Sequence, residues 1–185
     1  SFERYPSWSP DGNTVAYWSD QTGENEIWLL KPNTDALPQK LTGFKNGFGY
    51  HLYWSPDSKK IVTIDQAMKI KMIDVSNGSI TEVDQALRFM HGGCENFKVS
   101  WSPDSRWFTY SRDLDNYHIA VYIFDAQNKK LQQVTDGFYS CNNPVFDSDG
   151  KYLFLTTNQS FNPYYSDIDN SFIYGNSTKL AAISL

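Results

Sequence analysis

Residues 99–113 read "VSWSPDSRWFTYSRD", and the first half of this stretch recurs along the chain. It returns as "PSWSPDGNTVAYWSD" at residues 6–20, as "LYWSPDSKKIVTID" at 52–65 and, in a more divergent form, as "VFDSDGKYLFLTTN" at 145–158. The aromatic residue before each turn recurs after 46, 47 and 45 residues, and these anchors are Trp8, Trp54, Trp101 and Phe146. A period of about 45 residues that contains several short strands is typical of β-propeller blades.

Each repeat predicts the same order of strands, because its apolar residues alternate or form β-branched and aromatic runs instead of following helical spacing. A first strand ends at the aromatic anchor, and Ser-Pro-Asp-Gly or Ser-Pro-Asp-Ser then specifies a tight turn. The predicted second strands are residues 14–19, 60–65, 107–112 and 152–157. The predicted third strands are 26–31, 70–75, 120–126 and 179–185. The predicted fourth strands are 39–42, 80–83 and 131–135, and the last unit shows none.

These elements predict an all-β fold of four antiparallel, four-stranded propeller blades that form a partial or open propeller. The whole chain, residues 1–185, is one propeller region, with blades at about 1–44, 45–92, 93–137 and 138–185. An unpaired strand edge is a template for pairing with another chain, so we expect self-association through unpaired blade edges. An acidic residue falls at one place in every turn, which predicts a structural role in the turn for Asp11, Asp57, Asp104 and Asp149.

The composition excludes several classes of partner. The chain is 40% hydrophobic and 16% aromatic, and its net charge of −5 argues against nucleic acid or an anionic membrane as the main partner. No apolar stretch approaches the roughly 18 residues of a membrane span. The compartment in a prokaryotic cell, periplasmic or cytoplasmic, stays open.

The sequence predicts no catalytic residue, metal site or cofactor. A Gly-x-Ser-x-Gly turn is absent, and His51, His91 and His118 lie in different repeats without a companion at metal-ligand spacing. Cys94 follows His91 by three residues in a Gly-containing loop, but nothing in the sequence orients such a pair for nucleophilic catalysis. We expect Cys94 and Cys141 to be thiols instead of a disulfide or metal ligands.

The residues upstream of each anchor are the candidates for ligand contact. The first strand of a blade runs next to the propeller axis, and alternation turns every second residue to one side. The third residue upstream is Tyr5, His51, Lys98 or Asn143, and the fourth is Arg4, Tyr50, Phe97 or Asn142. One of these two registers is predicted to face the channel or its mouth, since the residues vary while the anchors stay constant.

The phrases "WSPDG", "VAYWSD", "IWLL" and "KLT" resemble the blade repeat shared by TolB-like propellers and by the non-catalytic propellers of the tricorn protease family. The last unit is more specific. Its "QVTDGFYSCNNPVFDSDGKYLFLTTNQSFNPYYSDIDNSF" at 133–172, followed by "TKLAAISL", is similar to the final blade of the second propeller in bacterial tricorn-like proteases. The family has the same Phe-Asn-Pro insertion, and we expect the aromatic insertion at 161–174 to dock a neighbouring domain.

This resemblance implies a non-catalytic propeller that gates or channels peptides and serves as a scaffold beside the catalytic domain of a serine peptidase. The implied partners are peptide substrates in transit or neighbouring protease domains. Two alternatives stay open at this point. One is a TolB-like periplasmic propeller that binds proteins, and the other is the propeller of a prolyl-oligopeptidase-type hydrolase or of a polysaccharide lyase.

Overall fold

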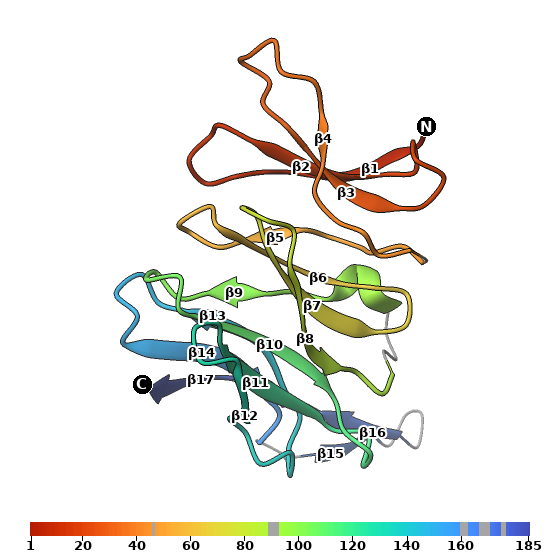
Figure 1. The fold of residues 1–185 in the computed structure, drawn as a ribbon. Helices are drawn as coiled ribbons and strands as arrows, with labels where there is room; N and C mark the ends of the chain where they lie inside the picture. The colour runs from red at the N-terminus through yellow and green to blue at the C-terminus, as the bar shows by residue number, and fades with distance from the viewer. Residues whose placement is uncertain (46, 89–92, 160–162, 167–170, 175–176) are drawn as a thin grey trace.

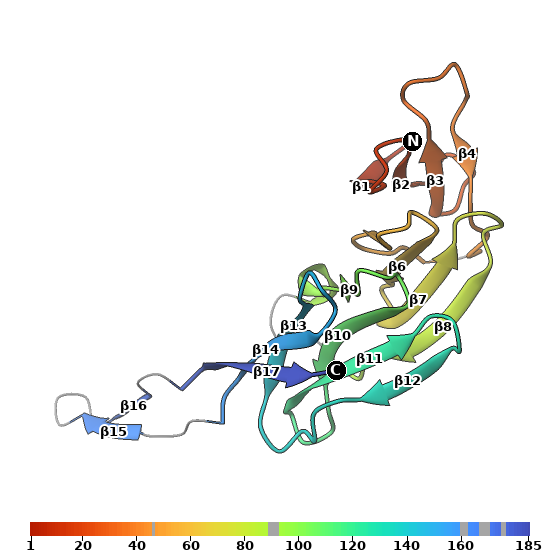
Figure 2. The ribbon, with the colours of Figure 1, turned by 90° about the vertical axis from the view of Figure 1, so that its left-hand side faces the viewer.

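The computed structural model describes residues 1–45, 47–88, 93–159, 163–166, 171–174 and 177–185, the two strands at 163–166 and 171–174 by their backbone alone. Three four-stranded sheets and one three-stranded sheet follow one another, and all strand pairs are antiparallel. Figure 1 shows the first three sheets stacked in chain order, and Figure 2 shows that the stack continues to the fourth sheet along a curve. The predicted all-β fold of consecutive blades is confirmed.

Blade 1 consists of β1 (Glu3–Trp8), β2 (Val15–Ser19), β3 (Glu26–Leu30) and β4 (Gln39–Lys40). Blade 2 consists of β5 (Tyr53–Trp54), β6 (Lys60–Ile64), β7 (Lys69–Asp74) and β8 (Ile80–Gln85). Blade 3 follows a short 3-10 helix, η1 (Gly93–Asn96), and consists of β9 (Ser100–Trp101), β10 (Trp107–Asp113), β11 (Ile119–Asp125) and β12 (Lys130–Gln133).

Blade 4 has three strands, β13 (Cys141–Phe146), β14 (Tyr152–Thr157) and β17 (Lys179–Ser184). The insertion between β14 and β17 contains a separate hairpin of β15 (Pro163–Ser166) and β16 (Ser171–Tyr174), which extends away from the blades (Figure 2). The prediction that its aromatic side chains dock a neighbour lies outside the described side chains. Among the described residues no strand pairs with the outer edge of β17. Blade 4 therefore lacks a fourth strand there, as its sequence predicted.

The hydrophobic core lies between the blades. Three clusters of buried side chains each combine residues of two consecutive blades. Fully buried members from both sides mark each junction: Ile27 and Ile61 for blades 1 and 2, Ile70 and Phe108 for blades 2 and 3, and Val121 and Leu153 for blades 3 and 4. A single blade therefore leaves apolar faces exposed, and each blade stabilises its neighbours by covering them.

The anchor residues connect each blade to the preceding one. The indole N–H of Trp54 donates to the carbonyl of Ser7 at 3.1 Å, and that of Trp101 donates to the carbonyl of Tyr53 at 3.3 Å. Phe146 has no side-chain donor, and its backbone N–H instead donates to Ser100 Oγ at 3.1 Å. The first anchor, Trp8, is 57% exposed.

The recurring Ser and Asp residues close each turn by mutual hydrogen bonds. Ser102 Oγ donates to Asp104 at 2.5 Å and accepts the backbone N–H of Trp107 at 2.9 Å. Asp104 in turn accepts the backbone N–H of Arg106 at 3.1 Å. The same bonds recur at Asp11 and Asp57, which supports the predicted structural role of these carboxylates.

Asp149 does not close its turn as the repeat predicts. In blade 4 the position of the turn Ser is occupied by Asp147, whose carboxylate accepts the backbone N–H of Tyr152 at 2.8 Å. A carboxylate has no proton to donate to Asp149, which instead lies exposed and 3.4 Å from the ammonium of Lys151. The acidic residue that closes this turn is therefore Asp147.

The fourth turn position has positive φ in every repeat. Gly12 and Gly150 have φ of 73° and 69°, and Ser58 and Ser105 both have φ of 60°. Serine is strained in this conformation, where glycine is free. The two serines, however, also join blades, because Ser58 Oγ accepts the backbone N–H of Asp11 at 3.2 Å and Ser105 Oγ accepts that of Asp57 at 2.9 Å.

Replacing Ser105 separates these two effects. Ser105→Ala removes the hydroxyl and keeps the strained backbone, so we expect a loss of about 1 kcal/mol in the free energy of unfolding. Ser105→Gly removes the same hydroxyl but relieves the strain, and we expect it to be more stable than Ser105→Ala by about 0.5–1 kcal/mol. Urea denaturation of the two variants measures the difference. Equal stability of Ala and Gly at this position would contradict the assignment of strain.

Several carboxylates ionise more readily in the folded chain. Hydrogen bonds from Ser9 and Ser102 lower the pKa of Asp11 and Asp104. Partial burial is the largest single influence on Asp57 and opposes its ionisation, but the hydrogen bonds from Ser55 and the backbone of Lys59, together with the charges of Lys59 and Lys60, lower the pKa of that carboxyl. Asp125 is 2% exposed, and although burial opposes its ionisation, bonds from Asn128 and Arg106 hold its pKa well below the ordinary range.

These shifts predict acid sensitivity. A carboxyl whose folded pKa is depressed contributes stability that is complete above its unfolded pKa of about 3.9 and is lost as the pH falls through the folded pKa. We therefore expect Asp104→Asn to lower the melting temperature at neutral pH and to shrink the further decrease below about pH 4. Asp149→Asn is the matched control, since this carboxylate closes no turn. An equal effect of the two substitutions would overturn the assignment.

Candidate functional site

Three predicted channel residues lie together in a groove of about 360 Å³. Tyr5, His51 and Lys98 come from the segments before the anchors of blades 1, 2 and 3, and Glu95 of η1 joins them. The rings of Tyr5 and His51 meet edge to face with centroids 4.7 Å apart. The phenol of Tyr5 donates to Glu95 Oε1 at 3.3 Å. The groove thus presents an imidazole, an ammonium and a carboxylate within one aromatic frame.

A second groove, of about 300 Å³, lies between blades 3 and 4. Lys98 lines this groove as well as the first one, together with Phe97, Asn142, Asn143 and the side chain of Arg112. The structure therefore brings predicted residues of all four blades into two grooves that share Lys98.

The two predicted registers differ in exposure. In the first register, three residues before each anchor, His51, Lys98 and Asn143 are exposed and Tyr5 is half-buried. We call these four residues the accessible row. The second register, four residues before each anchor, varies in exposure. Its Phe97 is 2% exposed and belongs to the core between blades 2 and 3.

The other residues four positions before an anchor also have contacts within the fold. Tyr50 packs partly buried against the core between blades 2 and 3. The guanidinium of Arg4 lies 4.1 Å from the ring centroid of Phe2, and Asn142 is half-buried. The carbonyl of Asn142 accepts the hydroxyl of Thr156 at 3.1 Å within blade 4.

Two β-bulges shape the ends of the accessible row. Tyr5 and Asn143 have φ of 50° and 51°, and the pairing register of β1 and β13 shifts at these residues. Each is followed by a proline, which cannot donate a hydrogen bond to the strand ladder and so favours a bulge. An X-Pro pair three residues before an anchor is thus a sequence signal for this bend.

Arg112, which lines the second groove, is paired with a carboxylate of blade 2. Arg112 Nε lies 2.6 Å from Asp84, and the phenol of Tyr110 donates to the same carboxylate at 2.7 Å. Burial raises the pKa of Tyr110, so its phenol stays a proton donor to Asp84. These contacts join β8 of blade 2 to β10 of blade 3. They hold the two blades together.

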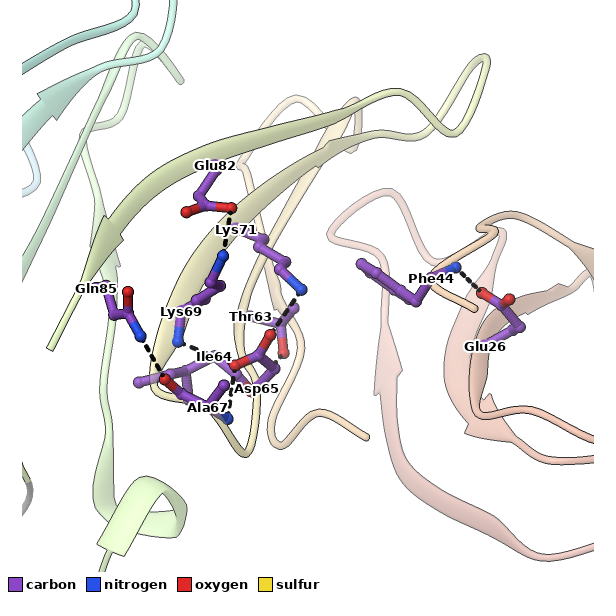
Figure 3. Close-up of polar contacts among 10 residues, drawn as sticks. All are labelled: Glu26, Phe44, Thr63, Ile64, Asp65, Ala67, Lys69, Lys71, Glu82 and Gln85. Carbon is purple, nitrogen blue, oxygen red and sulfur yellow. Dashed lines mark hydrogen bonds and ion pairs between the residues drawn. The ribbon is translucent and has the colours of Figure 1, made fainter. Parts of the chain in front are cut away.

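A further polar cluster, which the sequence did not predict, joins blades 1 and 2 (Figure 3). Asp65 accepts the backbone N–H of Lys69 at 2.9 Å and pairs with the ammonium of Lys71 at 2.6 Å. That ammonium lies 4.8 Å from the ring centroid of Phe44, whose backbone N–H donates to Glu26 at 2.9 Å. Each polar group of this cluster has a partner, which indicates a structural role.

The described residues contain no group of three or more His, Cys, Asp and Glu side chains that could hold a metal ion. Within the same part of the chain, no helix has the length and apolar character needed to cross a membrane.

His118 Nδ1 lies 3.0 Å from the carbonyl of Gly137, which ties this histidine to a turn. His91 lies outside the described residues. Cys94 and Cys141 are free and buried.

Burial raises the pKa of the Cys94 thiol, which predicts low nucleophilicity. We expect iodoacetamide to alkylate Cys94 in the native chain far more slowly than in urea, and mass spectrometry of tryptic peptides measures both rates. The other buried thiol, Cys141, is an internal comparison. Alkylation of native Cys94 as fast as in urea would contradict its burial and would show that its thiol is accessible and reactive.

The stacked antiparallel blades, with their core between the sheets, define a β-propeller. The family model for the tricorn protease second beta propeller domain matches residues 3–185. The chain therefore belongs to the family of tricorn protease second propellers.

Individual relatives agree with this assignment. A tricorn protease of Thermoplasma volcanium is 30% identical over 172 residues, which are 90% of this chain and 16% of that protein. A crystal structure of the tricorn protease superposes with a TM-score of 0.82 at 20% identity and covers 99% of this chain and 18% of its own. A putative TolB from Agrobacterium tumefaciens shares the fold with a TM-score of 0.56 at 21% identity, over 85% of this chain and 55% of its own. The chain spans about a sixth of the length of the tricorn relative.

Proposed function

We propose that this propeller region acts in a tricorn-type serine protease as a non-catalytic gate and scaffold, and that the accessible row contacts peptides on their way to a distant active site. The observation that carries the proposal is the convergence of Tyr5, His51, Lys98 and Asn143, one from each blade, on two grooves that share Lys98. The family membership supports the link to a peptidase.

The chemistry of the grooves suits a peptide in transit. Lys98 offers an ammonium to backbone carbonyls and acidic side chains, and Asn143 offers both a donor and an acceptor. Tyr5 and His51 add aromatic surface that tolerates many side chains. These contacts are open and few, which favours weak binding of varied sequences over tight binding of one sequence.

The same geometry argues against catalysis by this region. Nucleophilic catalysis needs a nucleophile, a base and an orienting group within reach of one another. In the first groove the rings of His51 and Tyr5 pack against each other, and Glu95 accepts the phenol of Tyr5. Among the described residues no hydrogen bond joins the hydroxyl of Ser7 to His51, or His51 to Glu95, although all three line this groove. The TolB-like alternative has the shared fold in its support.

Peptide binding tests the proposal directly. We expect a fluorescently labelled, unstructured acidic peptide to bind the chain weakly by anisotropy, and Lys98→Ala to weaken the affinity by about fivefold through loss of one charged contact. Lys40→Ala, at an exposed lysine on β4, is the matched control and should leave the affinity unchanged. Equal effects of the two substitutions would contradict a peptide site at the accessible row.

Activity measurements test the two halves of the proposal separately. Mass spectrometry should find the peptide intact after incubation with the chain, and cleavage that survives repurification would overturn the non-catalytic assignment. In the full-length protein, a bulky Lys98→Trp substitution should lower kcat/KM for long peptides more than for a very short substrate. An equal decrease for both substrates would count against gating.

A further inference from the structure

Next to the first groove lies a larger and more apolar one, of about 680 Å³, which we call the aromatic groove. It follows the first strands of consecutive blades and is lined by the rings of Trp8, Pro10, Tyr53, Trp54, Pro56 and Trp101. Its tryptophans and prolines come from the recurring Trp-Ser-Pro of the repeat. The motif that leads into each turn therefore also builds this surface.

The centre of the aromatic groove belongs to blades 2 and 3, which each pack against a blade on either side. Pro56 is exposed there, and Tyr53 and Trp101 are half-buried. The exposure of these rings is therefore not the result of a missing neighbour along the chain. The blades of a propeller surround a central channel, and the first strands lie next to it.

The aromatic side chains of blades 2 and 3 use their hydrogen-bond donors within the fold. The indole N–H groups of Trp54 and Trp101 donate to the carbonyls of Ser7 and Tyr53. The phenol of Tyr53 donates to the carbonyl of Phe97. These side chains thus offer a ligand ring surface, and the two carbonyls that border them already accept a hydrogen bond.

Proline suits such a surface better than other residues do. A peptide N–H that leaves water without finding an acceptor costs about 1–3 kcal/mol, and proline has no N–H. Proline-rich segments also adopt an extended polyproline II conformation in isolation, and they dock in grooves lined by aromatic side chains. The spent donors and the exposed rings therefore favour a proline-rich segment as the occupant.

We propose that the aromatic groove binds the proline-rich segment of a peptide whose acidic residues contact Lys98. This inference rests on the proposed function, because it names the class of peptide that the accessible row receives. The first groove and the aromatic groove are continuous, since Ser7, Leu52 and Tyr53 line both. One extended peptide can therefore contact Lys98 and the aromatic groove at the same time.

Fluorescence anisotropy with two labelled peptides tests this specificity in the 185-residue chain. In both peptides acidic residues flank a central segment, which is proline-rich in one and carries alanine at each of the proline positions in the other. We expect the chain to bind the proline peptide about tenfold more tightly. Pro56→Gln should reduce this preference to less than about threefold, because it replaces one ring of the groove by a neutral polar side chain.

The matched control for this variant is Pro103→Gln. Pro103 has the same place in the turn of blade 3 and is also exposed, but it lies outside the aromatic groove. The Pro103→Gln chain should keep the tenfold preference. Equal affinity of the wild type for the two peptides would overturn the inference, and so would a preference that the two substitutions change equally.

Lys98→Ala separates the inference from the proposed function. It should weaken both peptides by the same factor and leave the preference for proline unchanged. If Lys98→Ala weakens binding but the wild type does not distinguish the peptides, the inference fails and the peptide site at the accessible row stands. If neither peptide binds, or if Lys98→Ala changes neither affinity, the proposed function fails and the inference fails with it.

Discussion

The burial of each blade face against the next blade is the constraint on which the rest of the structure depends. The three core clusters lie between sheets, so the order of the blades and the spacing of the anchors determine whether there is a core at all. The indole bonds of Trp54 and Trp101 add direction to this burial, because each joins a specific backbone carbonyl of the preceding blade. The constant anchor thus reflects a requirement between repeats instead of within them.

The repeat period and the alternation of apolar residues were sufficient to predict the strands of all four blades, including the missing fourth strand of the last one. Both signals are local, and they act alike in each unit. Contacts between units were harder to predict from the sequence. Ser58 and Ser105 read as substitutes for a turn glycine, while their hydroxyls bond the neighbouring blade. In the other repeats a Ser hydroxyl donates a hydrogen bond to the turn aspartate. Asp147 takes the place of this Ser and has no hydroxyl proton to donate to Asp149, a difference that the repeat pattern does not show.

The candidate site was predictable in its residues but not in its register. Counting back from the anchors identified the accessible row together with a second row, and the distinction between them depends on burial between blades 2 and 3, where Phe97 packs. Glu95 was missed because it belongs to η1, which has no counterpart in the repeat. The pairs Asp65 with Lys71 and Asp84 with Arg112 were missed because their partners come together only when strands and blades pack.

The separation of these roles has a functional consequence. Stability rests on anchors, turn residues and interblade hydrogen bonds. Two of these bonds use the backbone carbonyls of Ser7 and Tyr53, which a residue of any type would supply. The accessible row lies three residues before each anchor and contributes little to the interblade cores, apart from Tyr5 at its edge. Its side chains are therefore free to differ between blades, as an imidazole, an ammonium and an amide do here, without changing the fold. A scaffold of this kind can alter what its grooves contact by single substitutions, which the proposed role as a gate for varied peptides would require.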